Sequence, residues 1–217
     1  LSYIGLSDNA IRTVSIDNFP NLSQLSLARN PLKTLSFSDD QPISTLDINE
    51  TGFTDFGSLA NIADTLGGLA AQRNGITSVA ALASFSSLGH LNLERNDISV
   101  IAAAFDAMSG TNIYLNQNPI LCVEQVRFES LAVNVYFDGQ CATDADGDGR
   151  PDGLDAFPND IAAARDSDGD GAPDDWNAGF GAEDSTTGLV LDTDDDNDGV
   201  NDDADAFPND PTDATDA

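Results

Sequence analysis

Apolar and polar residues alternate in a repeated pattern along the first 120 residues of the chain. Each unit carries apolar or small side chains at relative positions 1, 4, 6 and 11, and all units but one carry asparagine at position 9. The six units begin at residues 1, 22, 43, 66, 88 and 110, with spacings of 21, 21, 23, 22 and 22 residues. Positions 4 and 6 form a short strand with one face inward, so stacking of the units predicts a parallel sheet.

The asparagine at position 9 stands where the chain turns away from the strand. A buried amide at this point can bond backbone groups, of its own coil and of a neighbouring coil, that the turn leaves unpaired. Thr51 replaces asparagine in the third unit. Because its side chain is shorter and has no amide donor, we expect that coil to turn less regularly.

This pattern resembles the leucine-rich repeat family, in the short-repeat form of internalin-like bacterial surface proteins. The resemblance covers about 120 residues and implies an α/β fold, a parallel-sheet leucine-rich-repeat solenoid. The later apolar residues of each unit should close the convex side with short helical or 3₁₀ turns. Examples are Val79, Leu82, Phe85, Ile101, Phe105 and Met108.

Residues 119–141 are predicted to cover the last hydrophobic layer of the solenoid. A helix and then an extended piece are expected there, and Cys122 and Cys141 bracket the segment. We expect a disulfide that clamps this cap and contributes on the order of 3 kcal/mol. Two free thiols or a metal site are the alternatives. A disulfide implies an oxidising compartment, in keeping with an extracellular or cell-surface protein.

Charge divides the chain into two predicted domains, residues 1–141 and 142–217. The second holds 24 acidic and 2 basic side chains, a net charge of −22 out of −30 for the whole chain. Such acidity excludes nucleic-acid binding, because phosphate is held by Lys and Arg. The sequence also lacks the roughly 18 continuous apolar residues of a spanning helix, so we expect no membrane insertion within this chain.

The acidic domain contains a second repeat, an aspartate loop with carboxylates at positions 1, 3, 5, 9 and 12 and glycine at position 6. We call the three copies loop 1 (144–155), loop 2 (166–177) and loop 3 (194–205). Loops 1 and 3 continue into the same Phe-Pro-Asn-Asp string, whereas loop 2 has Asn177 at position 12. This arrangement resembles the calcium-binding thrombospondin type 3 repeat of bacterial extracellular proteins, over residues 144–210.

Carboxylates at alternate positions of a tight loop point to one centre, glycine permits the sharp turn, and position 7 can add a backbone carbonyl. Such an oxygen set favours several Ca²⁺ ions over Mg²⁺, and zinc would need His or Cys. A solvated acidic tail is the alternative without ions. Asp192 adds an overlapping register in which two ions would share loop 3. The expected ligands are Asp144, Asp146, Asp148, Arg150, Asp152, Asp155, Asp166, Asp168, Asp170, Ala172, Asp174, Asn177, Asp192, Asp194, Asp196, Asp198, Val200, Asp202 and Asp205.

The acidic domain has few large apolar residues with which to offset its conformational entropy. Calcium is expected to replace the missing core and to organise an otherwise irregular segment. Phe157 and Phe207, one after each outer loop, are expected to pack beneath the loops.

The single histidine, His90, has neither a nucleophile motif nor a metalloprotease helix around it, so catalysis is not expected. The residues beside the strand apolars form a polar, nearly uncharged concave face. Its richest corner consists of His90, Asn92, Tyr114 and Asn116. These side chains suit a glycan or a polar protein loop as partner, and a merely solvated face is the alternative.

Two classes of function remain. The first is a secreted or cell-surface recognition or adhesion module, non-catalytic and bacterial, with a calcium-stiffened stalk. The second is a structural subunit of an extracellular calcium-dependent filament or surface layer that contacts copies of itself. The second class is motivated by the first coil, because no cap precedes Leu1. The competing explanation is that the chain is a piece of a longer precursor, whose first coil would be uncovered in the same way.

Overall fold

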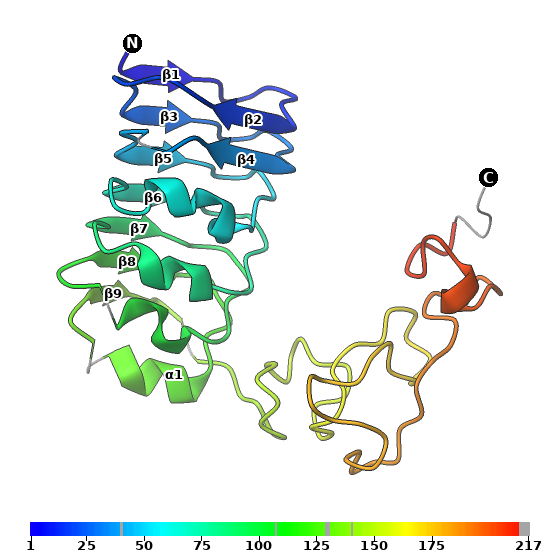
Figure 1. Cartoon of the computed structure of the whole chain (residues 1–217). Coiled ribbons are helices and arrows are strands. Elements are labelled where there is room, and N and C mark those ends of the chain that lie inside the picture. Colours follow the sequence, from blue (N-terminus) through cyan, green and yellow to red (C-terminus); the bar gives the residue numbers. More distant parts are fainter. Residues whose placement is uncertain (40, 107, 129–130, 140, 213–217) are drawn as a thin grey trace. The chain divides into compact units, whose positions relative to one another are not determined.

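The computed structural model describes residues 1–39, 41–106, 108–128, 131–139 and 141–212. The chain divides into two compact units, Leu1–Cys141 and Ala142–Ala217. We call them the solenoid and the acidic unit and describe each by itself (Figure 1).

The solenoid is built on a seven-stranded parallel sheet, which confirms the predicted stacking of the units (Figure 1). Adjacent strands are in register, so Leu25, Leu46 and Leu69 lie side by side at position 4 of their units. In sheet order the strands are β1 (Tyr3–Gly5), β3 (Gln24–Ser26), β5 (Thr45–Asp47), β6 (Gly68–Ala70), β7 (His90–Asn92), β8 (Asn112–Tyr114) and β9 (Asn134–Tyr136).

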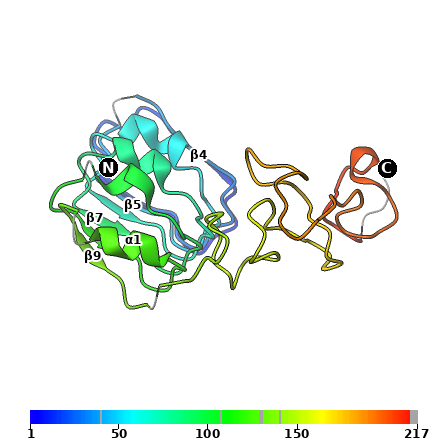
Figure 2. The same cartoon turned by 90° about the horizontal axis from the view of Figure 1, so that it is seen from below.

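The opposite side of the coil changes along the solenoid. In the first two coils it is a two-stranded parallel sheet, β2 (Thr13–Ile16) and β4 (Thr34–Phe37), where helical turns were expected. Both segments bury every second side chain, which is the period of a half-buried strand. In Figure 2, which views the solenoid from below, β4 lies on the side away from β5, β7 and β9 of the large sheet. In the later coils 3₁₀ turns form as predicted, at Phe56–Ile62, Ala80–Ser84 and Ala102–Phe105.

The asparagines at position 9 bond the backbone as predicted. Asn96 Nδ2 donates to the carbonyl oxygens of Leu93 in its own coil (2.8 Å) and of Ala71 in the preceding coil (3.0 Å). Its Oδ1 accepts the backbone N–H of Ile76 at 3.1 Å. Asn30 and Asn118 make the equivalent bonds. The ladder therefore satisfies backbone groups that the turns leave unpaired in the core.

The third coil turns like its neighbours, contrary to the expectation from Thr51. The residue at position 8 takes up a left-handed backbone in this coil as in the others, with φ of 56° at Glu50 and 55° at Arg29. Thr51 Oγ1 donates to the carbonyl of Ile48 (2.8 Å), and Asn74 of the next coil accepts the backbone N–H of Thr51 (2.7 Å). The backbone carbonyl of Thr51 accepts the N–H of Leu32 in the preceding coil (3.1 Å), the group that the asparagine side chain accepts in other coils.

The last coil contains helix α1 (Cys122–Arg127) and strand β9, which pairs with β8. The predicted disulfide between Cys122 and Cys141 is present. Phe128 and Phe137 pack against the core with their rings edge to face, 6.0 Å between centroids. This segment covers the last hydrophobic layer, as predicted.

The acidic unit consists mostly of turns and bends, with a short 3₁₀ turn at Asp202–Ala204. Its buried apolar side chains are small: Ala162 and Ala163 are 0% exposed. Phe157 is partly buried, but Phe207 is 53% exposed, so the prediction that Phe207 packs beneath its loop is wrong. Apolar burial therefore contributes little to the order of this unit.

Candidate metal centres

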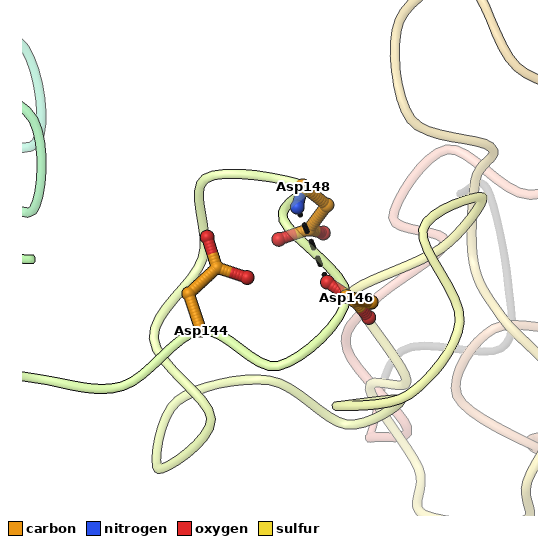
Figure 3. Close-up of side chains that lie close together, drawn as sticks. All are labelled: Asp144, Asp146 and Asp148. Carbon is orange, nitrogen blue, oxygen red and sulfur yellow. Dashed lines mark hydrogen bonds between the residues drawn. The ribbon is translucent and has the colours of Figure 1, made fainter. Parts of the chain in front are cut away.

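Each aspartate loop brings the carboxylates at positions 1, 3 and 5 together. One ligand oxygen from each of the three aspartates lies within 4.8 Å of the others. Figure 3 shows this arrangement for Asp144, Asp146 and Asp148, whose side chains gather on one turn of loop 1. The other two groups are Asp166, Asp168 and Asp170 in loop 2, and Asp194, Asp196 and Asp198 in loop 3.

Backbone N–H groups hold these carboxylates in place. In loop 1, Asp146 accepts the N–H of Asp148 (3.1 Å), and Asp148 accepts the N–H of Arg150 (2.6 Å). Loops 2 and 3 repeat both bonds. The glycine at position 6 has a left-handed backbone in each loop, with φ of 96°, 94° and 97°. In loop 1 both oxygens of Asp144 also accept backbone N–H groups, from Gly147 (2.7 Å) and Gly149 (3.1 Å), and loop 2 repeats these two bonds.

Several carboxylate oxygens of loops 1 and 3 are buried and have no hydrogen-bond partner among the described residues. In loop 1 they are Oδ2 of Asp146 and Oδ2 of Asp155. In loop 3 they are Oδ1 of Asp194 and Oδ2 of Asp196, Asp198 and Asp205. Buried polar atoms are normally paired, so such a concentration of unpaired carboxylate oxygens is the chemistry of a site that takes a cation.

Burial also raises the pKa values of three of these aspartates. Burial raises the pKa of Asp155 to about 6, and the neighbouring charges of Asp148 and Asp146 add to this effect. Burial also raises the pKa of Asp146 and of Asp196. A bound hard divalent cation would lower these pKa values, because it stabilises the ionised carboxylates that burial destabilises.

The aspartates at position 9 close the loops. Asp152 accepts the backbone N–H of Ala145 (2.7 Å) with one oxygen and the hydroxyl of Thr143 (2.5 Å) with the other. Asp174 likewise uses both oxygens, for the N–H and the hydroxyl of Ser167, each at 2.7 Å. Both carboxylates therefore hold the start of their loop by hydrogen bonds, and the ligand role expected for them stays a prediction.

Asn177 lies elsewhere than its sequence position suggested. It was expected to complete loop 2, but its Nδ2 donates to Asp148 Oδ2 of loop 1 (2.7 Å) and to the carbonyl of Ile161 (3.0 Å). Asn197 of loop 3 reaches back in the same way, donating to Asp168 of loop 2. In both cases an amide contacts a carboxylate of the preceding loop, so the loops are linked to one another.

The other expected ligands have the following places. Arg150, Ala172 and Val200 at position 7 each donate a backbone N–H to the aspartate at position 5. Asp192 Oδ1 accepts the N–H of Asp194 at 3.0 Å. The backbone N–H of Asp192 donates to the carbonyl of Pro173 (3.0 Å), which joins the start of loop 3 to loop 2.

Asp160, from the first Phe-Pro-Asn-Asp string, has a role that the sequence reasoning missed. Its side chain is 1% exposed, and its Oδ2 accepts the hydroxyl of Ser185 (2.6 Å) and both the N–H (2.9 Å) and the hydroxyl (2.6 Å) of Thr187. Burial alone would raise the pKa of Asp160, but these bonds outweigh burial and hold it below the ordinary value. Asp210, in the second string, is exposed, and its Oδ1 accepts the N–H and the hydroxyl of Thr212, two residues further along the chain. Repetition of the string alone could not separate these two roles.

The concave face of the solenoid carries a second candidate site. His90 and Tyr114 have ring centroids 5.0 Å apart, and Tyr114 stacks on Tyr136 at 4.6 Å, a partner that the sequence reasoning did not include. The register of β8 with β9 places Tyr136 beside Tyr114. Nearby, Glu94 accepts the side-chain amides of Asn116 (2.6 Å), Gln72 (3.1 Å) and Asn92 (3.5 Å).

The chain matches neither a protein-family model nor a curated protein. Among solved structures it is similar to internalin C2 from Listeria monocytogenes, with 20% sequence identity and a TM-score of 0.43. The match covers 63% of this chain and 80% of that chain. No helix within the described part of the chain has both the length and the apolar character needed to cross a bilayer.

Proposed function

We propose that this chain is a non-catalytic recognition module of a secreted or surface-exposed bacterial protein, and that calcium organises its acidic unit. The observation that carries the calcium proposal is the group of buried, unpaired carboxylate oxygens in loops 1 and 3. In loop 3 all three clustered aspartates, Asp194, Asp196 and Asp198, carry such an oxygen, which fits a hard cation with oxygen ligands. The disulfide supports an oxidising compartment outside the cytosol.

In this proposal the aspartates at positions 1, 3, 5 and 12 and the carbonyl at position 7 hold the ions, as in the thrombospondin type 3 repeats that the sequence resembles. Loop 2 is the weakest centre. Asp170 is exposed, and no carboxylate stands at position 12 of this loop. The buried unpaired oxygens described above all belong to loops 1 and 3.

Recognition is assigned to the concave face. His90, Tyr114 and Tyr136 form an aromatic row, and such rings present flat apolar surfaces with polar edges. The amides that Glu94 holds in place add fixed hydrogen-bonding groups. The partner is a protein or a glycan, because aromatic and amide groups without a strong net charge suit both.

Calorimetric titration of the full chain with calcium tests the proposal. We expect uptake of several ions with dissociation constants of about 10⁻⁴ to 10⁻³ M or tighter, and weaker uptake of magnesium. Asp146→Asn should lower calcium uptake. Asp203→Asn, which removes an exposed charge, should not. Absence of uptake at millimolar calcium would end the calcium proposal.

A further inference from the structure

The concave face of the solenoid carries carboxylates but no lysine or arginine. Its side chains stand at positions 3, 5 and 7 of the coils, and the last coil, which holds β9, is counted from residue 132. None of these positions is Lys or Arg, whereas Asp47, Glu94 and Asp138 each add a negative charge. Glu94 and Asp138 both stand at position 7, in the coils on either side of β8. We call this end of the face the acidic corner: Glu94, Tyr114, Asn116, Tyr136 and Asp138.

Tyr136 presents an open ring face beside Asp138. Its side chain is 46% exposed, and Tyr114 stacks on one face of the ring with an interplanar angle of 9°. No ring of the described residues contacts the other face. The backbone N–H of Gln117 donates to Asp138 Oδ1 (3.2 Å) and holds this carboxylate beside the preceding coil. No described residue donates to Asp138 Oδ2, so an exposed carboxylate oxygen lies two residues from the open ring.

The amides of the corner add further acceptors. Asn116 Nδ2 and Gln72 Nε2 donate to Glu94, at 2.6 and 3.1 Å. Their donors are thereby used, and no described residue donates to the amide oxygens of these two side chains. Amide and carboxylate oxygens only accept hydrogen bonds. The corner therefore complements a ligand that is rich in donors.

The described part of the chain supplies no cation to this corner. Its ion pairs join other groups, such as Arg29 with Asp8 and Arg73 with Glu50. Arg95 follows Glu94 directly, but it lies exposed on the turn at position 8 and forms no ion pair with Glu94 among the described residues. The negative charge of the corner is therefore left for a partner.

We propose that the acidic corner binds a basic segment of a protein partner, with an arginine guanidinium against the open face of Tyr136 and paired with Asp138. A guanidinium is flat, stacks on aromatic rings, and has five N–H donors and no acceptor. Glu94 lies two strands away, about 10 Å, where it can pair with a second basic side chain. The inference rests on the proposed recognition role of the concave face and names the chemistry of its partner. A neutral glycan would use the rings but not the carboxylates.

Nuclear magnetic resonance of the full chain at saturating calcium tests the inference. The probe is a tetra-arginine peptide, and a tetra-citrulline peptide, which has the same shape without the charge, is its control. The chain has three tyrosines, so the ring signals of Tyr114 and Tyr136 report the corner and those of Tyr3 report the opposite end of the sheet. These signals report binding at the corner even where the peptide also contacts the acidic unit. Maltotriose serves as the neutral glycan.

We expect the arginine peptide to shift the rings of Tyr114 and Tyr136 but not of Tyr3, and the citrulline peptide to bind about tenfold more weakly. Asp138→Asn should weaken the arginine peptide by about fivefold. The matched control is Asp97→Asn, which removes an exposed charge at position 10 of the coil that holds β7 and should change the affinity by less than about twofold. If Asp138→Asn does not fold, Tyr136→Leu should weaken binding by about threefold.

Equal affinity of the arginine and citrulline peptides, or equal effects of Asp138→Asn and Asp97→Asn, would overturn the inference. Tighter binding of maltotriose than of the arginine peptide at the same rings would also overturn it, while the recognition role of the concave face would stand. If neither probe shifts the rings of Tyr114 and Tyr136, the inference is wrong and the recognition role loses its support, whereas the calcium proposal is unaffected.

Discussion

The solenoid and the acidic unit bury different chemistry. In the solenoid, successive coils place Leu69, Leu91 and Ile113 at 0% exposed beside one another. In the acidic unit the buried side chains include alanines and four aspartates: Asp160, Asp174, Asp195 and Asp196. Apolar side chains gain free energy on leaving water, whereas carboxylates lose it unless donors or cations pair with them. The order of the solenoid thus depends on its own side chains, and that of the acidic unit on partners for its carboxylates.

The largest effect of a single substitution is expected in the solenoid core. Phe85 is 1% exposed, so Phe85→Ala should lower the free energy of unfolding by about 3–5 kcal/mol, because a large cavity replaces the ring. Urea unfolding followed by circular dichroism measures it. The same loss is expected with and without calcium.

Phe19→Ala is the matched control, since Phe19 is 39% exposed. We expect it to cost about 1 kcal/mol or less. Equal losses of unfolding free energy for the two variants would contradict the placement of Phe85 in the hydrophobic core. A loss for Phe85→Ala that depends on calcium would contradict the independent stability of the two units.

A smaller effect is expected at Asp160 in the acidic unit. Asp160→Asn should destabilise this unit by about 2–3 kcal/mol at saturating calcium, because buried donors of Ser185 and Thr187 lose a charged acceptor. The only tryptophan of the chain, Trp176, lies in this unit, so its fluorescence during urea unfolding reports the unit selectively.

Asp210→Asn, in the exposed copy of the same string, serves as control and should leave the stability of the unit nearly unchanged. The pKa of Asp160 lies below its ordinary value of 3.8. Its contribution is therefore complete above that value and is lost only as the pH falls through the folded pKa. The stability difference between wild type and Asp160→Asn should stay constant from about pH 7 to pH 5; a difference that disappears in this range would contradict the assignment.

The smallest effect is expected at Asn177, which contacts loop 1 in the structure but belongs to loop 2 by its spacing in the sequence. Asn177→Asp adds a carboxylate beside Asp148, so it should tighten calcium binding at loop 1, on the order of tenfold, and leave loop 2 little changed. Nuclear magnetic resonance separates the two, because the amides of Gly149 and Gly171 report loops 1 and 2. Tightening at Gly171 alone would mean that Asn177 belongs to loop 2, as its spacing suggested.

Features that repeat with the coil could be predicted from the sequence. The strand faces and the asparagine ladder follow from residues in register, because each coil contacts its neighbours. The disulfide was predicted separately, because Cys122 and Cys141 bracket the cap. The two-stranded sheet β2–β4 was missed, although Thr13–Ile16 and Thr34–Phe37 alternate in period two. The left-handed residue at position 8 was also missed, since arginine and glutamate there give no conformational signal.

The acidic unit was less predictable for a physical reason. Its three aspartate groups follow from alternate spacing within a loop. The contacts that join loops do not: Asn177 meets Asp148, and Asn197 meets Asp168, each across 29 residues. Burial of Asp160 depends on Ser185 and Thr187, which lie outside any repeat. Such contacts arise from tertiary packing, which local spacing does not encode.

Hydrogen exchange of the full chain, with calcium and with a chelator, tests most directly whether the two units are stabilised by different chemistry. We predict that chelation removes protection from amides throughout residues 144–210 and leaves the buried strands of the solenoid, such as those around Leu69 and Leu91, protected to the same extent. Retained protection in the acidic unit, or equal loss in both units, would contradict the account.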